Sequence, residues 1–233
     1  MRTLLDLVLP VSCVACGARG VVACPPCAAT LDRPARLAWP RPAPAGLPPP
    51  FAVAPYAGAP RAFLLAYKEQ GCLGVRRLLA GGLAQAVLAA VTATGAGSAW
   101  LVPVPSTAAA RRARGDDVVA RLARLAAGDL RRRGLDCAVV GVLRHQRAVR
   151  DSAGLGAADR SANLAGAFTA QARGAARLST RPVVLVDDLV TTGATLSECA
   201  RALRAAGATV IAAAVVAATP RRPVRIRPPA DAR

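Results

Sequence analysis

The chain has 233 residues, a length at which a folded protein buries about two-thirds or more of its unfolded surface, so disorder throughout is excluded. Apolar residues make up 54% of the chain but aromatic residues only 3%, so a core must consist mainly of Leu, Val and Ala. The net charge is +18, carried almost wholly by arginine because Lys68 is the only lysine. A positive field of this strength favours phosphates, nucleic acid or an acidic partner.

Residues 1–33 hold four of the seven cysteines, in two Cys-x2-Cys pairs. The apolar run at the N-terminus is short, is interrupted by Asp6 and lacks a cleavage pattern, so we expect no secretory signal and a cytoplasmic protein. Four thiolates at this spacing can surround one tetrahedral ion, and zinc is favoured over two disulfides in that compartment. Such a closed site is structural rather than catalytic. The predicted zinc ligands are Cys13, Cys16, Cys24 and Cys27.

The remaining cysteines, Cys72, Cys137 and Cys199, stand in apolar or helical contexts and are interpreted as core residues. Residues 34–50 are rich in proline and predict a semi-rigid, extended linker to the main domain at residues 51–219. The final residues, 220–233, are basic and Pro-rich, which predicts a disordered tail.

The main domain begins with a predicted strand at 51–58, followed by helices at 59–71 and 73–93. Residues 78–110 contain no charged residue, which raises the question of a membrane span. The stretch also contains Gln85, a Gly-rich turn and two prolines, so a buried helix followed by a turn and a strand fits better than membrane insertion.

Further along, apolar β-branched runs alternate with amphipathic ones. The predicted strands are 100–105, 137–143, 182–188 and 209–217, and the predicted helices are 116–134 and 195–207. Residues 144–168 are charged and Gly-rich, which indicates a long loop with a short helix at 157–164. This alternation predicts an α/β fold with a parallel sheet flanked by helices.

The segment VVLVDDLVTTGATL, residues 183–196, carries the strongest functional signal. Asp187 and Asp188 end a buried strand, where ligands of open parallel sheets bind. The TTGAT sequence that follows supplies free amides, a glycine and hydroxyls at the start of a helix, which together form an anion cradle. Carboxylates beside such a cradle predict a site for a phosphorylated ribose. A turn capped only for stability is the alternative, but it explains one acid and one threonine rather than all of them.

This spacing resembles the 5-phosphoribosyl-1-pyrophosphate (PRPP) signature of type I phosphoribosyltransferases. The resemblance implies that Asp187 and Asp188 face the ribose hydroxyls and act as the catalytic pair, with Mg²⁺ on the pyrophosphate. It also implies that the 5′-phosphate binds the loop of Thr191, Thr192, Gly193, Ala194 and Thr195. A nucleotide-binding loop of the Walker type is the competing interpretation, and the required Gly-Lys-Ser/Thr sequence does not occur.

With the four cysteines in front of it, the domain resembles the ComF family, which includes ComF and the GntX-like proteins. Four further segments resemble the family: LAYKEQG at 65–71, LVPVP at 101–105, RARG at 112–115 and RSANLAGAF at 160–168. The resemblance implies a type I phosphoribosyltransferase-like fold and a link to DNA uptake in natural competence, with a helicase partner and single-stranded DNA. The chain departs from the family at Asp116, Asp117 and Ser152, which puts the second substrate in doubt.

By position in type I folds, the loop from Ser106 onward faces pyrophosphate, and residues 144–159 take the place of a mobile lid. Candidate phosphate ligands there, which solvated surface explains as well, are Arg111, Arg112, Arg114, Arg144, Arg147 and Arg150. His145, the sole histidine, is either a general base or an exposed loop residue.

Two functions follow from these patterns. One is a phosphoribosyltransferase that moves the phosphoribosyl group of PRPP to an acceptor that the sequence does not identify. The other is a non-catalytic protein that senses PRPP or binds single-stranded DNA during uptake. The oligomeric state is left open by the sequence.

Overall fold

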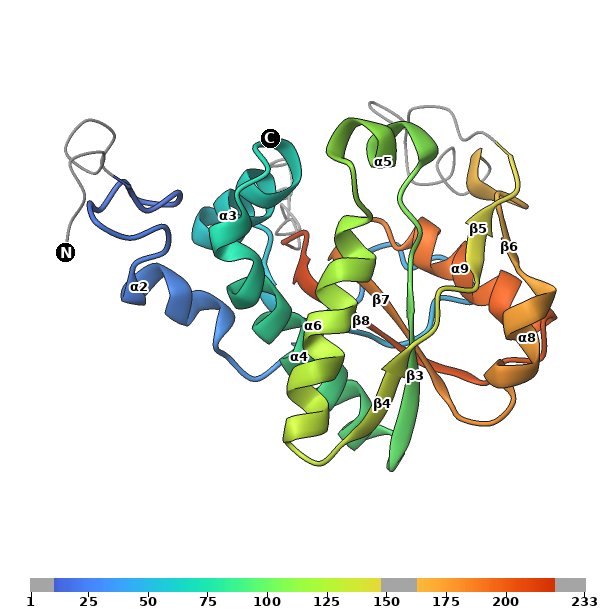
Figure 1. Ribbon diagram of the computed structural model, residues 1–233. Helices are drawn as coiled ribbons and strands as arrows, with labels where there is room; N and C mark the ends of the chain where they lie inside the picture. Colours follow the sequence, from blue (N-terminus) through green and yellow to red (C-terminus); the bar gives the residue numbers. More distant parts are fainter. Residues whose placement is uncertain (1–10, 148–162, 221–233) are drawn as a thin grey trace, which may run out of the picture.

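A computed structural model describes residues 11–147 and 163–220 of the chain (Figure 1). Its centre is a six-stranded sheet in the order β1-β2-β8-β7-β3-β4, in which only β1 is antiparallel to its neighbour. The strands are β1 (Arg36–Leu37), β2 (Pro50–Pro55), β3 (Ser98–Pro103), β4 (Asp136–Val139), β7 (Val183–Val190) and β8 (Val210–Ala218). The α/β fold with a parallel sheet is therefore confirmed.

Helices cover both faces of this sheet, as Figure 1 shows. One face packs against α3 (Gly58–Glu69), α4 (Arg76–Ala93) and α6 (Val118–Arg132). The other face packs against α9 (Ala194–Ala205) and the C-terminal end of α8 (Ala172–Leu178). Side chains alternate along β7, so Val184 and Val186 join the first core while Val183 and Leu185 join the second.

The order of the strands creates a switch point between β3 and β7. After β3 the chain moves outward to β4, whereas after β7 it moves to β8 on the opposite side. The connections leaving β3 and β7 therefore diverge at the carboxyl ends of these strands, which is where open α/β sheets form a crevice. Ligands of open α/β sheets bind in crevices of this kind.

Helix α4, which follows the turn η2 (Leu73–Val75), contains the first part of the uncharged stretch 78–110 that raised the question of a membrane span. Residues Leu73–Ala93 are long and apolar enough to cross a membrane by length and composition alone, but 56% of the window is buried inside the protein. The side chains of Leu79, Leu83 and Val87 are fully buried in the core shared with α6 and the sheet. This burial is typical of the core helix of a globular domain.

The cysteine-containing segment and the Pro-rich segment both pack on the main domain. In the first, the short helices α2 (Pro25–Ala28) and η1 (Ala29–Leu31) bring Leu31 into the core, where it is 2% exposed. In the second, β1 pairs with β2, and the loop after it contacts α9. The Ser197 hydroxyl donates to the Ala45 carbonyl at 2.5 Å, and Arg204 donates to the Gly46 carbonyl at 2.6 Å.

Several elements, β1 among them, were not expected from the sequence. A short helix, α5 (Ala108–Arg114), follows β3, and α8 precedes β7. The two ends of the expected long loop also form the paired strands of a hairpin, β5 (Leu143–His145) and β6 (Phe168–Ala170). The interpretation of 144–168 as loop is wrong at these two ends. Its middle part, most of the short helix expected at 157–164 and the tail at 221–233 lie outside the described residues.

Candidate functional site

The acidic and hydroxyl-rich segment lies at the switch-point crevice. Strand β7 carries both aspartates and ends at Val190, and α9 begins at Ala194, so residues 191–193 form the connecting turn. Gly193 takes a left-handed conformation with φ +77°, which glycine adopts without a steric penalty. The apolar run before the acids and the helix after them thus place the turn at the carboxyl end of the sheet.

The amides of this turn are available to a ligand. Within the described part of the chain, the N–H groups of Thr191, Thr192 and Gly193 donate to no backbone or side-chain acceptor. The Ala194 amide makes a long bond of 3.4 Å to the Thr192 hydroxyl. Unpaired amides at the N-terminus of a helix bind anions, because the helix dipole adds partial positive charge there.

The two aspartates point to opposite faces of the sheet. Asp187 is half-buried and lines a cavity of about 20 Å³ together with Leu189, Val190, Thr191, Gly193, Thr195 and Leu196. A cavity of this size holds about one water molecule, so a sugar phosphate would have to lie across its mouth. Asp188 is 3% exposed and faces α3. The structure therefore brings only Asp187 into a shared cavity with the threonine turn.

Lys68 neutralises the buried acid. Its ammonium, at the last turn of α3, lies 2.5 Å from Asp188 Oδ2. This oxygen is buried and finds no hydrogen-bond partner elsewhere in the described residues, so the ion pair is its compensation. We did not predict Lys68 as a site residue. Two signals were available: it is the only lysine of an arginine-rich chain, and it lies in the segment LAYKEQG that resembles the ComF family.

The environment changes the proton affinity of these groups. Burial raises the pKa of Asp187 well above its ordinary value, the charge of Asp188 adds to the rise, and Lys68 opposes it. Burial lowers the pKa of Lys68, but Asp188 and Asp187 raise it by more, so the net shift is upward. Lys68 therefore stays charged, and without its charge Asp187 would bind a proton still more tightly.

The loop after β3 reaches the same edge. The Val104 amide donates to the Val186 carbonyl at 2.9 Å, one residue before the acids. The next turn is fixed by Asp117, which accepts bonds from the amide and the hydroxyl of Ser106 and caps α6 through the Ala120 amide. The acid at position 117, where the family resemblance leads one to expect another residue, thus has a structural role.

His145 packs between the end of β3 and the hairpin, and the candidate arginines that the structure describes lie at the surface. The His145 Nε2 lies 3.1 Å from the Pro105 carbonyl, and its ring packs on Phe168 at 4.6 Å. Arg147 donates at 2.8 Å to the carbonyls of Asn163 and Ala165, across the base of the hairpin. Arg111, Arg112, Arg114 and Arg144 are exposed, and Arg150 lies outside the described residues.

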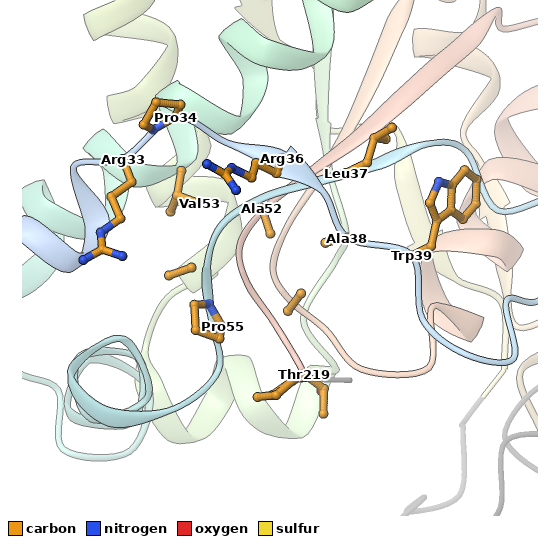
Figure 2. A pocket seen from close by; sticks show the side chains of 13 residues that line it. Arg33, Pro34, Arg36, Leu37, Ala38, Trp39, Ala52, Val53, Pro55 and Thr219 are labelled. Atoms are coloured by element: carbon orange, nitrogen blue, oxygen red, sulfur yellow. The ribbon is translucent and has the colours of Figure 1, made fainter. Parts of the chain in front are cut away.

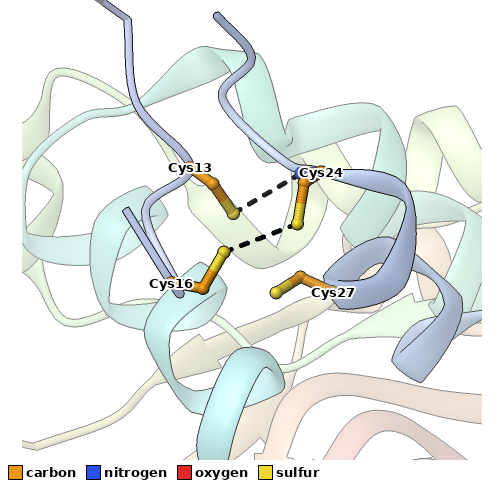
Figure 3. A group of neighbouring side chains, drawn as sticks. All are labelled: Cys13, Cys16, Cys24 and Cys27. Atoms are coloured by element: carbon orange, nitrogen blue, oxygen red, sulfur yellow. Dashed lines mark hydrogen bonds between the residues drawn. The ribbon is translucent and has the colours of Figure 1, made fainter. Parts of the chain in front are cut away.

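The four N-terminal cysteines converge, as Figure 3 shows. Their sulfur atoms all lie within 4.8 Å of one another, and Cys16 Sγ is 3.5 Å from Cys24 Sγ. A tetrahedral ion at about 2.3 Å from each thiolate sets the sulfur atoms about 3.8 Å apart, which fits this cluster. Backbone amides lower the pKa of Cys13 to about 6, the Cys24 amide first among them. The cluster can therefore hold a metal ion.

Besides a cavity of about 420 Å³ lined by residues of α2, η1 and α4, two further cavities lie apart from the threonine turn. One, of about 540 Å³, follows the edge strand β1 and is lined by Arg33, Arg36, Trp39, Pro55 and Thr219 among others (Figure 2). The other, of about 400 Å³, lies between the end of α3 and the turn from α5 to α6. Lys68 lines this second cavity, so the lysine separates it from Asp188.

Comparison with known proteins agrees with this geometry. Residues 116–231 match the family model described as the phosphoribosyl transferase domain. The match covers α6, β4, β7, α9 and β8, and so includes both aspartates and the threonine turn. No curated protein matches the chain. The chain therefore contains a phosphoribosyl transferase domain, built on a mostly parallel six-stranded sheet and preceded by a four-cysteine cluster.

Proposed function

We propose that the carboxyl edge of β7 binds PRPP and transfers its phosphoribosyl group to an acceptor, with release of pyrophosphate. The observation that carries the proposal is the turn at residues 191–193, whose amides have no acceptor among the described residues and whose cavity is shared with Asp187. A phosphate on the amides and ribose hydroxyls on the carboxylate are compatible with one ligand lying across this cavity. The family match supports the same ligand class.

The roles of the residues follow from charge. The threonine turn would anchor the 5′-phosphate, and Asp187 would accept hydrogen bonds from the ribose hydroxyls. Asp188 stays in the site as the partner of Lys68. Mg²⁺ would neutralise the departing pyrophosphate when bound with PRPP. In such a reaction positive charge develops on the ribose, and fixed carboxylates near the sugar stabilise that charge without reorganising.

For the cysteine cluster we propose a structural zinc ion, held by Cys13, Cys16, Cys24 and Cys27. Four thiolates complete a tetrahedral zinc site and leave no open position for a substrate. The amide donated to Cys13 Sγ by Cys24, at 3.4 Å, stabilises the thiolate form that zinc requires.

Thermal melting with PRPP, with and without Mg²⁺, tests the ribose-phosphate site. At about 100 times the dissociation constant, a ligand specific for the folded state adds about 2.7 kcal/mol to the free energy of unfolding. We expect Asp187→Asn to lose most of this gain because a neutral amide accepts weaker hydrogen bonds from the ribose hydroxyls than a carboxylate does. Asp32→Asn, which changes an exposed acid far from β7, is the control and should keep the gain. Full stabilisation of the Asp187→Asn variant would refute the assignment.

A second candidate function rests on charge. The net charge of +18 and the exposed arginines of α5 favour contact with nucleic acid, in keeping with the ComF-like arrangement of a cysteine cluster before this domain. A PRPP-sensing or single-strand-binding protein of DNA uptake would release no pyrophosphate with any acceptor and would bind single-stranded DNA in a salt-sensitive manner. Pyrophosphate release with one acceptor of a nucleobase and amine panel would favour the enzyme.

A further inference from the structure

We propose that Lys68 is a positioning residue of the ribose-phosphate site, which supplies a positive charge that lets two adjacent carboxylates stand ionised beside a polyphosphate ligand. The inference rests on the proposed function and deepens it. It starts from the contact between Lys68 Nζ and Asp188 Oδ2, 2.5 Å apart and at the edge of the sheet where the threonine turn lies.

The placement of Lys68 supports a role beyond stability. The lysine stands at the end of α3, which packs on the same face of the sheet as the Asp188 side chain. The Asp188 side chain is 5% exposed and that of Lys68 is 29% exposed, the latter through the cavity of about 400 Å³. The ammonium thus spans the space between a buried carboxylate and a cavity large enough for a small ligand.

The negative charges of the two aspartates explain why the ammonium of Lys68 matters for PRPP binding. Without Lys68, Asp187 and Asp188 would present up to two negative charges within a few residues of amides that bind phosphate. PRPP is itself a polyanion, so an uncompensated acid pair would repel it. With Lys68 in place Asp188 is neutralised, and Asp187 alone faces the threonine turn. If Lys68 is removed, the Asp188 carboxylate stays buried without a compensating charge or water, and it repels the phosphates of PRPP.

A proton can replace the ammonium, which gives the inference a pH signature. In Lys68→Met, one carboxyl of the pair should bind a proton more tightly than in the wild type, because the neighbouring cation is gone. Two other titratable groups face the cluster. Arg114 of α5 lowers the pKa of Lys68, and burial raises the pKa of the Cys199 thiol on α9, which therefore stays neutral.

Calorimetric titration of PRPP with Mg²⁺ into Lys68→Met tests this inference. At pH about 8 we expect affinity to fall about tenfold or more, a factor that corresponds to about 1.4 kcal/mol. The deficit relative to the wild type should shrink as the pH is lowered toward about 6, because protonation of the acid pair replaces the lost charge. Lys68→Arg should recover much of the affinity. Arg61→Met, an exposed change on the same helix, is the control and should match the wild type at each pH.

Chemical modification covers the case in which Lys68→Met does not fold. Because Lys68 is the only lysine, acetylation of the folded wild type changes one side-chain amine besides the N-terminus, and removes its charge. Reductive methylation of the same amine keeps the charge. Acetylated protein should bind PRPP weakly with the same pH signature, and methylated protein should bind nearly as well as unmodified protein.

The outcomes separate the inference from the proposed function. If the wild type binds no PRPP, the proposed function fails and the role of Lys68 in it falls as well. If the wild type binds PRPP but the Met variant, or the acetylated protein, binds with the same affinity and pH dependence, only the inference about Lys68 is wrong. Weakened binding that stays equally weak at every pH would indicate structural damage and would also overturn it.

Discussion

At the residue scale, Asp187 makes stability depend on pH in a direction that is unusual for a carboxylate. Burial raises its pKa above the ordinary value of 3.8, so the folded chain binds this proton more tightly than the unfolded chain. The resulting contribution to the free energy of unfolding is fully present below pH 3.8 and is lost as the pH rises through the raised pKa. Most aspartates that are paired in a folded protein give the opposite slope.

We therefore expect Asp187→Asn to flatten this part of the pH dependence. Urea unfolding of the wild type and the variant, between pH about 5 and about 8, measures the effect. The variant should gain stability relative to the wild type as the pH rises, because the wild type must bury an ionised carboxylate and the variant does not. Asp32→Asn, on the surface, should follow the wild type. A constant difference between variant and wild type across the range would contradict the burial argument.

Gly193 allows a second prediction at this scale. A Cβ at this position would lie 2.9 Å from Leu47 Cδ2 and 3.2 Å from Pro40 Cγ, in a backbone conformation with φ +77°. Gly193→Ala should cost about 1–2 kcal/mol for the left-handed backbone and about 1 kcal/mol or more for the contacts. Gly95→Ala is matched, since it has φ +66° and no atom within 4 Å, and should show the backbone cost alone. Equal losses in denaturant unfolding would mean that Leu47 and Pro40 move aside without cost.

At the scale of elements, the Pro-rich segment before β2 holds the helix of the phosphate-binding turn. Ser197 and Arg204, both on α9, donate to the carbonyls of Ala45 and Gly46. Each bond contributes about 1 kcal/mol, so the double variant Ser197→Ala/Arg204→Ala should raise local opening several-fold or more. Hydrogen exchange of the amides at residues 45–47 measures this opening. Arg201→Ala on the same helix, where the partner is Glu198, should leave these amides unchanged, and a similar rise there would rule out the two bonds as the cause.

The sequence predicts an element well where its signal is local. The apolar run of β7 and the amphipathic pattern of α6, capped by Asp117, are read directly from residue types at fixed spacing. Helix α5 is seven residues long and buries none of its side chains, so no apolar periodicity marks it. The hairpin of β5 and β6 joins residues more than twenty positions apart, and such pairing leaves no local pattern.

The candidate site shows the same division. Residues 187–195 could be assigned from one segment because a strand, a turn and a helix follow each other directly. The partner of Asp188 could not be assigned in this way, because Lys68 lies 120 positions earlier and reaches the acid only through the packing of α3 on the sheet. Side chains alternate along β7, so the two acids point to opposite faces of the sheet. The sequence alone instead predicts that these neighbouring acids form one pair facing the same ligand.

At the scale of the whole molecule, a series of side-chain contacts connects the cysteine cluster to the acid pair. Val22, between the two cysteine pairs, lies against Gly74 in the turn after α3, where a Cβ would be 3.1 Å from its methyl groups. Leu31 enters the core that contains Phe63 of α3. Helix α3 in turn carries Lys68 in its last turn, where the ammonium pairs with Asp188 of β7. The cluster, the helix and the ion pair therefore form one continuous contact path.

This path predicts that removal of the metal from the cysteine cluster destabilises α3. A chelator that strips the cysteine cluster should unfold residues 11–33, since few apolar side chains hold them without an ion. Loss of the contacts of Val22 and Leu31 should then raise hydrogen exchange across α3 (Gly58–Glu69) and weaken PRPP binding through Lys68. Cys16→Ser should reproduce the effect and Cys72→Ser, outside the cluster, should not. If exchange in α3 stays unchanged while residues 11–33 unfold, the cluster and the phosphoribosyl transferase domain are energetically independent, and Lys68 must be positioned by the core of the domain alone.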